Sequence, residues 1–177
     1  MRQLRNFLLT FFLLVPALAF AHGPTRQKLS LAVDVKAPPA EVWAVIGNFQ
    51  DMSWHPAVFS STGTGDNAID ATRVLTLGKE GGPTISEQLY KYDAAKMSYS
   101  YRITAVDVAV LPVTNYSSHL TVTPTASGGS HIEWRGAFYR GYPNNDPPEN
   151  LNDAAAIAAV TGVYKAGLDA LEAKFGK

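Results

Sequence analysis

The feature that most constrains the fold of this chain is a long run of strand-like segments, residues 58–139, with a turn signal after each one. Short segments rich in β-branched and aromatic residues alternate there with clusters of Gly, Pro, Asp and Ser. Spacing of this kind predicts an antiparallel meander. The predicted strands cover residues 58–61, 71–77, 84–92, 97–103 with a continuation to 110, 113–123 and 131–140.

The segments on either side of the meander add one strand and three helices. Residues 28–36 alternate apolar and polar positions, which predicts a half-buried strand. Apolar residues then recur at helical spacing behind Pro39, so a short helix follows, with a further helical turn at 51–54. A last helix is expected to begin after Asn150 or Asn152, either of which can cap it, and to run to about residue 175.

Together these elements predict an α+β fold. A curved antiparallel sheet of about seven strands would wrap round the long C-terminal helix, with two short helices after the first strand. The sequence has no internal repeat and no long linker, so residues 28–177 are expected to form a single domain. The many Ala and Gly residues of the last helix should let it pack closely against the sheet.

The composition excludes several classes of protein and site. The 177 residues include no Cys, which excludes disulfides, thiolate metal sites and thiol nucleophiles. Basic and acidic residues number 15 each, and no run of like charge occurs, so nucleic acid is not an expected partner. No metal motif, nucleophile elbow, phosphate-binding loop or dinucleotide motif is present. We therefore expect no metal, no cofactor and no catalytic site.

The first 21 residues are typical of a secretory signal peptide. Arg2 and Arg5 precede an apolar stretch, and the small-x-small sequence at 19–21 is typical of a cleavage site. The stretch is shorter than the ~20 apolar residues that span a bilayer, so a membrane anchor is the less favoured alternative. We expect a signal peptide at 1–21 and a flexible leader at 22–27, with no membrane attachment after cleavage. An exported chain without disulfides favours a bacterial periplasm.

The turn at 79–83 fixes the expected register of the hairpin around it. Mirror positions place Leu75 opposite Ile85 and Arg73 opposite Glu87, all on the inward face. An inward ion pair could hold a ligand's carbonyl or hydroxyl group, or orient it for acid–base chemistry. It could also be purely structural, because a single buried charge is costly. The sequence leaves both alternatives open.

Inward positions of the later strands carry four aromatic residues: Tyr101, Tyr116, Trp134 and Phe138. They could line a cavity in which hydroxyls and an indole N–H supply a few polar groups. Aromatic rings are also the ordinary filling of a small barrel, so a filled core is the alternative. His55 follows Trp54 near the expected cavity mouth. It could act as a base, a ligand or a pH-sensitive contact, or belong only to the turn at Pro56.

A loop rich in Pro and Asn separates the last strand from the last helix. Its candidate contact residues are Arg140, Tyr142, Asn144, Asn145 and Asp146. A stiff loop loses little entropy on docking, so it is a candidate surface for a partner protein. The alternative is that its three prolines only direct the chain into the helix.

Several motifs resemble a known superfamily. The sequence Ala-Pro-Pro-Ala-Glu-Val-Trp at 37–43, followed by Asn-Phe-x-x-Met-x-Trp-His-Pro at 48–56, resembles the SRPBCC superfamily of START, Bet v 1 and polyketide-cyclase-like domains. The segments 54–58, 111–116 and 133–148 resemble more specifically the MxaD-like family of periplasmic proteins of bacterial methanol oxidation. The most specific of these is 133–148, with its Trp-Arg-Gly motif and Pro/Asn loop.

The resemblance implies a helix-grip fold over residues 28 to 175 and a non-catalytic accessory protein. Its partners would be PQQ-dependent methanol dehydrogenase and the c-type cytochrome that accepts its electrons, and the chain itself would hold neither PQQ nor haem. A periplasmic carrier of a small hydrophobic or aromatic ligand is the main alternative. A cyclase- or dehydratase-like enzyme is a third, because fold alone does not establish function.

Overall fold

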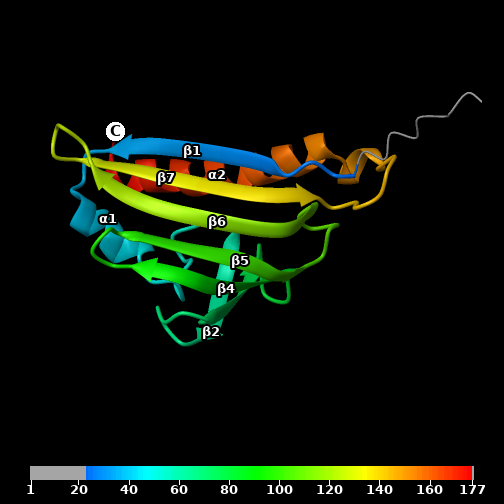
Figure 1. Cartoon of the computed structure of the whole chain (residues 1–177). Helices are drawn as coiled ribbons and strands as arrows, with labels where there is room; N and C mark the ends of the chain where they lie inside the picture. The colour runs from blue at the N-terminus through cyan, green and yellow to red at the C-terminus, as the bar shows by residue number, and fades with distance from the viewer. Residues whose placement is uncertain (1–22, 177) are drawn as a thin grey trace, which may run out of the picture.

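The computed structural model describes residues 23–176, and the predicted signal peptide lies outside the described residues. Seven strands form one antiparallel sheet in the order β1-β7-β6-β5-β4-β3-β2 (Figure 1). In chain order the elements are β1 Gln27–Val35, α1 Pro39–Ile46, β2 Val58–Thr64, β3 Thr72–Leu77, β4 Thr84–Asp93, β5 Ser98–Val106, β6 Val113–Pro124, β7 Ser130–Arg140, the 3₁₀ helix η1 Glu149–Leu151 and α2 Asp153–Phe175. This is the predicted α+β helix-grip architecture.

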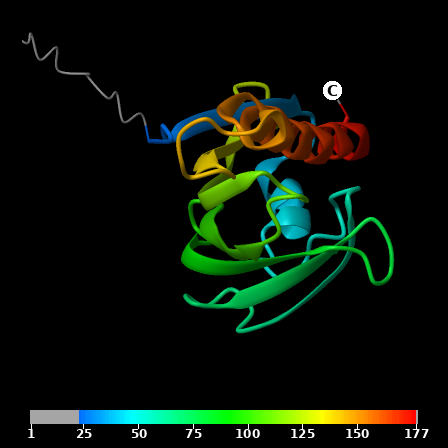
Figure 2. The same cartoon turned by 90° about the vertical axis from the view of Figure 1, so that its right-hand side faces the viewer.

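The sheet curves so that its two ends face different elements. Helix α2 packs on β1 and β7 at one end, and α1 contacts β6 and β7 from within the curve (Figures 1 and 2). Strands β2 and β3 close the opposite side (Figure 2). The space on the concave side of the sheet is therefore enclosed by the sheet, by α2 and by α1. The hydrophobic core fills this space.

The strand register confirms the hairpin predicted from the sequence. In the β3–β4 pair, Leu75 lies opposite Ile85 and Arg73 lies opposite Glu87. All four side chains are buried, whereas Val74 between them is exposed. Because side chains alternate between the two faces of a strand, this register places the ion pair on the same inner face as the core residues.

The predicted second short helix is not formed. Residues 51–57 make turns, in which the Ser53 N–H bonds to Asp51 Oδ1 at 2.8 Å and the His55 N–H bonds to the Met52 carbonyl at 3.0 Å. An aspartate side chain that accepts from the backbone two residues later favours a turn over a helix. The strand predicted to continue to residue 110 ends at Val106 for the same reason, since Asp107 Oδ1 accepts from the Ala109 N–H.

Helix α2 begins at one of the two predicted caps, and its small residues let it pack closely against the sheet. Of the two predicted caps, Asn152 is the one used: its side chain accepts from the Ala155 N–H at 2.8 Å. At Gly167 an added Cβ would lie 2.7 Å from the His55 ring and 2.8 Å from the Trp134 ring, so the helix approaches the sheet closely there. By length and hydropathy alone α2 could cross a membrane, but six of its residues are buried in the fold, as in a core helix.

Candidate ligand-binding cavity

Arg73 and Glu87 form a buried ion pair between β3 and β4. Arg73 Nε donates to Glu87 Oε2 at 2.6 Å, and Arg73 Nη1 donates to the Phe49 carbonyl at 2.5 Å. The guanidinium also lies over the rings of Phe49 and Tyr101, at 4.3 and 5.1 Å from their centroids. Arg73 is 1% exposed and Glu87 is 5% exposed. The arginine is thus held by groups of the protein itself.

Burial affects the two charges of the pair differently. Burial raises the pKa of Glu87, and the attraction of Arg73 offsets this rise only in part. Burial also opposes the charge on Arg73, but Glu87, Tyr99 and Tyr101 outweigh it, so the pKa of Arg73 is raised. Glu87 is therefore the member of the pair whose protonation would respond if the charge or the burial around the pair changed, because burial works against its charged form and Arg73 offsets this only in part.

A network of buried hydroxyl groups lies beside the pair. Ser118 Oγ donates to the Arg135 carbonyl at 2.9 Å and accepts from Trp134 Nε1 at 2.9 Å. The Tyr164 hydroxyl lies 3.0 Å from Ser118 Oγ and 2.7 Å from the Tyr116 hydroxyl. Because Ser118 gives its hydrogen to a carbonyl, Tyr164 must donate to Ser118, and Tyr116 must donate to Tyr164.

The tyrosines of this region stay protonated. Burial raises the pKa of Tyr101 and of Tyr116 well above the usual value, and it raises the pKa of Tyr164 to about 12. Trp134 stacks on Tyr164 with ring centroids 4.5 Å apart, which fixes the indole over the phenol. Gly136 makes room for this arrangement, since an added Cβ would lie 2.2 Å from the Tyr164 hydroxyl.

A cavity of about 80 Å³ lies between the pair and the network. Aliphatic side chains make up most of its wall, and most of these come from the strands and from α2. Five of the eight residues predicted for the cavity line it: His55, Glu87, Tyr101, Tyr116 and Trp134. The inward aromatic residues therefore do two things, since most of their surface fills the core and part of it faces this small space.

Two residues that line the cavity, Glu87 and Tyr101, each keep a hydrogen-bonding site that no other described residue uses. Among the described residues, Glu87 accepts at Oε2, and no hydrogen bond reaches Oε1. The Tyr101 hydroxyl accepts from Trp134 Nε1 at 3.2 Å, and its own hydrogen has no acceptor in the described chain. The cavity thus offers one acceptor and one donor to a bound molecule.

The other three predicted cavity residues lie outside the wall. Phe138 is fully buried and stacks on Tyr116, with centroids 6.1 Å apart. Arg73 lies behind Glu87, as described above. Trp54 packs against Trp134 at 5.6 Å, and its indole N–H is buried without a hydrogen-bond partner in the described chain.

His55 links the turns at 51–57 to α2. Its Nε2 lies 3.0 Å from the Val163 carbonyl, and its Nδ1 accepts from the Ala57 N–H at 3.2 Å. The ring is therefore the neutral tautomer with hydrogen on Nε2. Burial lowers the pKa of His55, and nearby Arg73 lowers it further against the opposing Val163 carbonyl. Both ring nitrogens are engaged, so the geometry does not fit a free base.

The loop after β7 is organised from inside by Arg140. Arg140 is 7% exposed; its Nε donates to the Tyr142 carbonyl and its Nη2 to the Asn144 carbonyl, both at 2.8 Å. Its Nη1 also lies 3.4 Å from Asp153 Oδ2. Arg140 is therefore not part of the loop's outer surface, contrary to the prediction. Of the other predicted contact residues, Asn144, Asn145 and Asp146 are exposed and Tyr142 is half-buried.

Sequence reasoning missed two residues of the site, Ser118 and Tyr164. Ser118 occupies an inward position of β6 between Tyr116 and Leu120, and a polar residue at such a position was the available signal. Tyr164 lies on the buried face of α2, and helical spacing alone gives no indication of the strand that its side chain reaches. Among residues 23–176, no group of three or more His, Asp or Glu side chains is placed to hold a metal ion.

Three comparisons relate the chain to known proteins. The protein named XoxI from Bacillus cereus has a solved structure that is 31% identical, with a TM-score of 0.70, over 84% of this chain and 94% of that one. MLP-like protein 423 of Arabidopsis thaliana is 28% identical over 138 residues, 72% of this chain and 85% of that protein. Ribonuclease 1 of Panax ginseng is 25% identical over 103 residues, 58% of this chain and 66% of that protein.

A family-level match covers nearly all of the described chain. Residues 26–176 match the family described as "Polyketide cyclase / dehydrase and lipid transport". The match includes every strand, α1, α2 and all residues of the cavity wall. It agrees with the helix-grip architecture and with the SRPBCC resemblance of the sequence. The chain belongs to this family of polyketide cyclases, dehydrases and lipid-transport proteins.

Proposed function

We propose that this protein binds a small, largely apolar molecule with one hydroxyl group in the cavity between β4, β5 and α2. The observation that carries the proposal is the pair of unpartnered atoms in an otherwise apolar wall, Glu87 Oε1 and the Tyr101 O–H. A ligand hydroxyl can donate to the carboxylate and accept from the phenol at once. A few well-placed polar groups in an apolar wall are typical of small-molecule sites.

The volume of the cavity limits the ligand. Pockets for drug-sized molecules measure roughly 300–1,000 Å³, and an engineered apolar cavity of about 150 Å³ admits benzene. At about 80 Å³, this cavity suits a short-chain alcohol without rearrangement. A larger ligand would need the wall to move, and the partly exposed side chains of Val58, Leu77 and Val163 mark the side where it could.

We propose binding without catalysis. The candidate base His55 uses both ring nitrogens in backbone hydrogen bonds. Arg73 is held by Glu87 and by the Phe49 carbonyl, so it does not face the ligand space. Besides Glu87, the titratable group that the cavity offers to a ligand is the Tyr101 hydroxyl. Burial raises the pKa of Tyr101 well above its usual value, so we assign this hydroxyl the role of a hydrogen-bond donor and not of a partner in proton transfer.

Ligand-observed NMR with 1-butanol tests this function. Butyl methyl ether, which accepts but cannot donate a hydrogen bond, serves as the control ligand. Tyr101→Phe should weaken 1-butanol binding about tenfold, the effect of one lost hydrogen bond in an apolar site. Tyr139→Phe is the matched control, because Tyr139 lies on the outer face of β7. Equal binding of both ligands, or equal affinity of the two variants, would remove the proposed hydroxyl site.

We also propose, as a second function, that the protein is a periplasmic accessory factor for PQQ-dependent methanol dehydrogenase and its c-type cytochrome. The support is the resemblance of segments 54–58, 111–116 and 133–148 to the MxaD-like family. A specific observation favours a docking role: Arg140 holds the loop in one shape and leaves Asn144 and Asn145 exposed. A preordered loop loses less entropy on binding.

The accessory function has its own test. Electron transfer from purified methanol dehydrogenase to the cytochrome would be measured with and without the chain starting at His22, over a series of salt concentrations. Acceleration that saturates near equal amounts, and that is lost in Asn144→Ala with Asn145→Ala, is the expected result. A rate unchanged at every ratio would exclude this role and leave the cavity proposal untouched.

A further inference from the structure

The outer face of the sheet carries positive charge in a regular pattern. The strand register places five residues in one row across five strands: Ser30, Arg135, His119, Ser100 and Lys91. The neighbouring row consists of Lys28, Ala137, Ser117, Arg102 and Gln88. Residues directly opposite each other share a face, so both rows lie on the side away from the cavity. We call these two rows the outer strip.

The outer strip holds four cations, and neither row contains an Asp or Glu. Arg26 adds a fifth cation at its edge, where its Nη2 donates to Ser117 Oγ at 3.1 Å. Acidic residues begin in the next row, which includes Glu133 and Asp93. The full sequence has equal numbers of acidic and basic residues, so this strip is a local excess of positive charge.

Most of the positive charge of the outer strip has no counter-ion among the described residues. Among the described residues, the side chains of Lys28 and Lys91 have no hydrogen-bond partner and no counter-ion, although the backbones of both belong to the sheet. Arg102 Nε donates to the neutral Gln88 Oε1 at 3.0 Å. Arg135 has a carboxylate oxygen of Glu133 at 4.0 Å, the limit of an ion pair. Cations without a counter-ion are available to an external anion.

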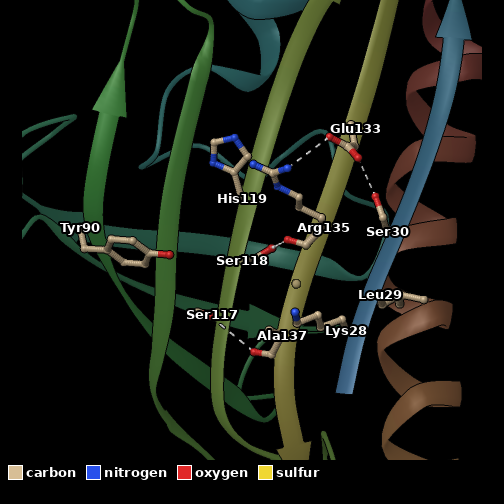
Figure 3. Close-up of a pocket in the computed structure, with 11 residues that line it drawn as sticks. Lys28, Leu29, Ser30, Tyr90, Ser117, Ser118, His119, Glu133, Arg135 and Ala137 are labelled. Atoms are coloured by element: carbon tan, nitrogen blue, oxygen red, sulfur yellow. Dashed lines mark hydrogen bonds and ion pairs between the residues drawn. The ribbon is translucent and has the colours of Figure 1, made fainter. Parts of the chain in front are cut away.

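The surface is hollowed along the strip. A shallow groove of about 540 Å³ is lined there by Lys28, Tyr90, His119, Arg135 and, at its edge, Glu133, among other residues. Figure 3 shows these side chains, with Arg135 extending towards His119 and joined to Glu133. A second hollow of about 640 Å³ includes Lys91 and shares His119 and Arg135 with the first. The shared residues make the two hollows one trough that crosses the strands.

We propose that the outer strip docks an extended acidic segment of a partner protein. Four spacings of about 4.8 Å separate five strands, about 19 Å in all, which matches roughly six residues of extended chain. The acidic row with Glu133 and Asp93 limits the positive surface to a narrow band. A single peptide segment fits such a band better than the broad anionic surface of a membrane or of nucleic acid.

His119 provides an internal reporter for this surface. It lies in the middle of the strip, with Nδ1 at 2.8 Å from Ser100 Oγ and Nε2 at 3.1 Å from Thr121 Oγ. Burial, then Arg135 and Lys91, lower the pKa of His119, against a smaller opposing effect of Glu133. Carboxylates bound across the strip would offset the two cations, so the pKa of His119 should rise on binding.

The test uses a fluorescein-labelled peptide with six consecutive Glu residues, with a six-Gln peptide as its control. Fluorescence anisotropy at low salt should show tighter binding of the Glu peptide, and affinity should fall as salt is added. Arg135→Gln with Lys91→Gln should weaken binding about tenfold, a few-fold for each exposed ion pair. Lys79→Gln with Lys174→Gln is the matched control, because it removes two exposed cations elsewhere and should change affinity less than twofold.

Several outcomes would overturn the proposal. Equal loss of affinity in the two double variants would attribute binding to net charge alone. Equal binding of the Glu and Gln peptides would exclude recognition of acidic side chains. Tighter binding to phosphatidylglycerol vesicles or to a twelve-nucleotide single-stranded DNA would assign the strip to a different partner. NMR titration of His119 gives the second measurement, and an unchanged pKa with bound Glu peptide would place the peptide elsewhere.

Discussion

Replacing Arg73 by methionine would leave the Glu87 carboxylate buried without its counter-ion, and we expect a large loss of stability. The side chain removed is 1% exposed, donates to Glu87 and to the Phe49 carbonyl, and lies over two aromatic rings. Removing one partner of a buried pair costs about 3–5 kcal/mol. That is a large share of the about 5–15 kcal/mol by which a domain is usually stable.

Two further variants separate charge from packing. Arg73→Met with Glu87→Leu removes both charges and fills the site with apolar side chains. This double variant should lose less stability than Arg73→Met alone, because replacing a whole buried ion pair by apolar residues is often close to neutral. Glu87→Gln keeps an acceptor for Arg73 Nε, and the guanidinium keeps the Phe49 carbonyl. We expect Glu87→Gln to lose about 1–3 kcal/mol, the effect of weakening one charged hydrogen bond.

Urea denaturation followed by circular dichroism at pH 7 and pH 5 measures these differences. Without Arg73, no positive charge opposes the effect of burial on the Glu87 carboxylate, so the pKa of Glu87 rises further above its ordinary value of 4.5. A carboxyl with a raised folded-state pKa favours the folded state below its unfolded pKa, and this contribution is lost as the pH rises. The deficit of Arg73→Met should therefore shrink from pH 7 to pH 5. Additive losses in the double variant, or a deficit independent of pH, would refute a coupled buried pair.

Three further predictions concern the elements around the cavity. Burial lowers the pKa of His55, so the contribution of this histidine to stability is present above about pH 6.5 and is lost as the pH falls. The urea midpoint of the protein should therefore decline between pH 7 and pH 5, and His55→Gln should make this decline smaller. Gly167→Ala should cost about 1–3 kcal/mol by overpacking, whereas Gly162→Ala, with no atom within 4 Å of the new Cβ, should stabilise by about 0.5–1 kcal/mol. Arg140→Met should free the loop carbonyls and speed proteolytic cleavage within 141–152, with Lys165→Met on α2 as the control; equal cleavage rates would show that Arg140 does not hold the loop.

The sequence predicted the inner and outer faces of the sheet because strand geometry is simple. A short turn fixes which residues of a hairpin face each other, and side chains alternate with a period of two. These two rules placed Arg73 opposite Glu87 and Leu75 opposite Ile85 on the inward face, as the structure has them. The order of elements likewise predicted an α+β fold in which a curved antiparallel sheet wraps round the last helix, and the structure has this arrangement.

The remaining features depend on interactions that have no sequence period. Whether an inward aromatic residue borders empty space is decided by the volumes of its neighbours, so the cavity wall could not be separated from the core. Arg140 turns back on its own loop because two backbone carbonyls lie within its reach, which only the loop conformation reveals. The predicted helix at 51–54 does not form, because a local hydrogen bond to the Asp51 side chain favours a turn. Helical spacing of apolar residues does not exclude such a turn.

The aromatic side of the cavity is the side least able to yield to a larger ligand. Trp134, Ser118, Tyr164 and Tyr116 are joined by hydrogen bonds, and opening this side would leave buried donors and acceptors unpaired, at about 1–3 kcal/mol each. The rest of the wall is mostly aliphatic, and aliphatic side chains can separate without breaking a side-chain hydrogen bond, as long as the bond from His55 to the Val163 carbonyl is kept. A relative or variant that accepts a larger molecule should therefore keep the hydrogen-bonded aromatic side of the cavity and enlarge the aliphatic part of the wall near Val163. Under the proposed function, Glu87 and Tyr101 would select the hydroxyl group, and the aliphatic part of the wall would set the length of the molecule that carries it.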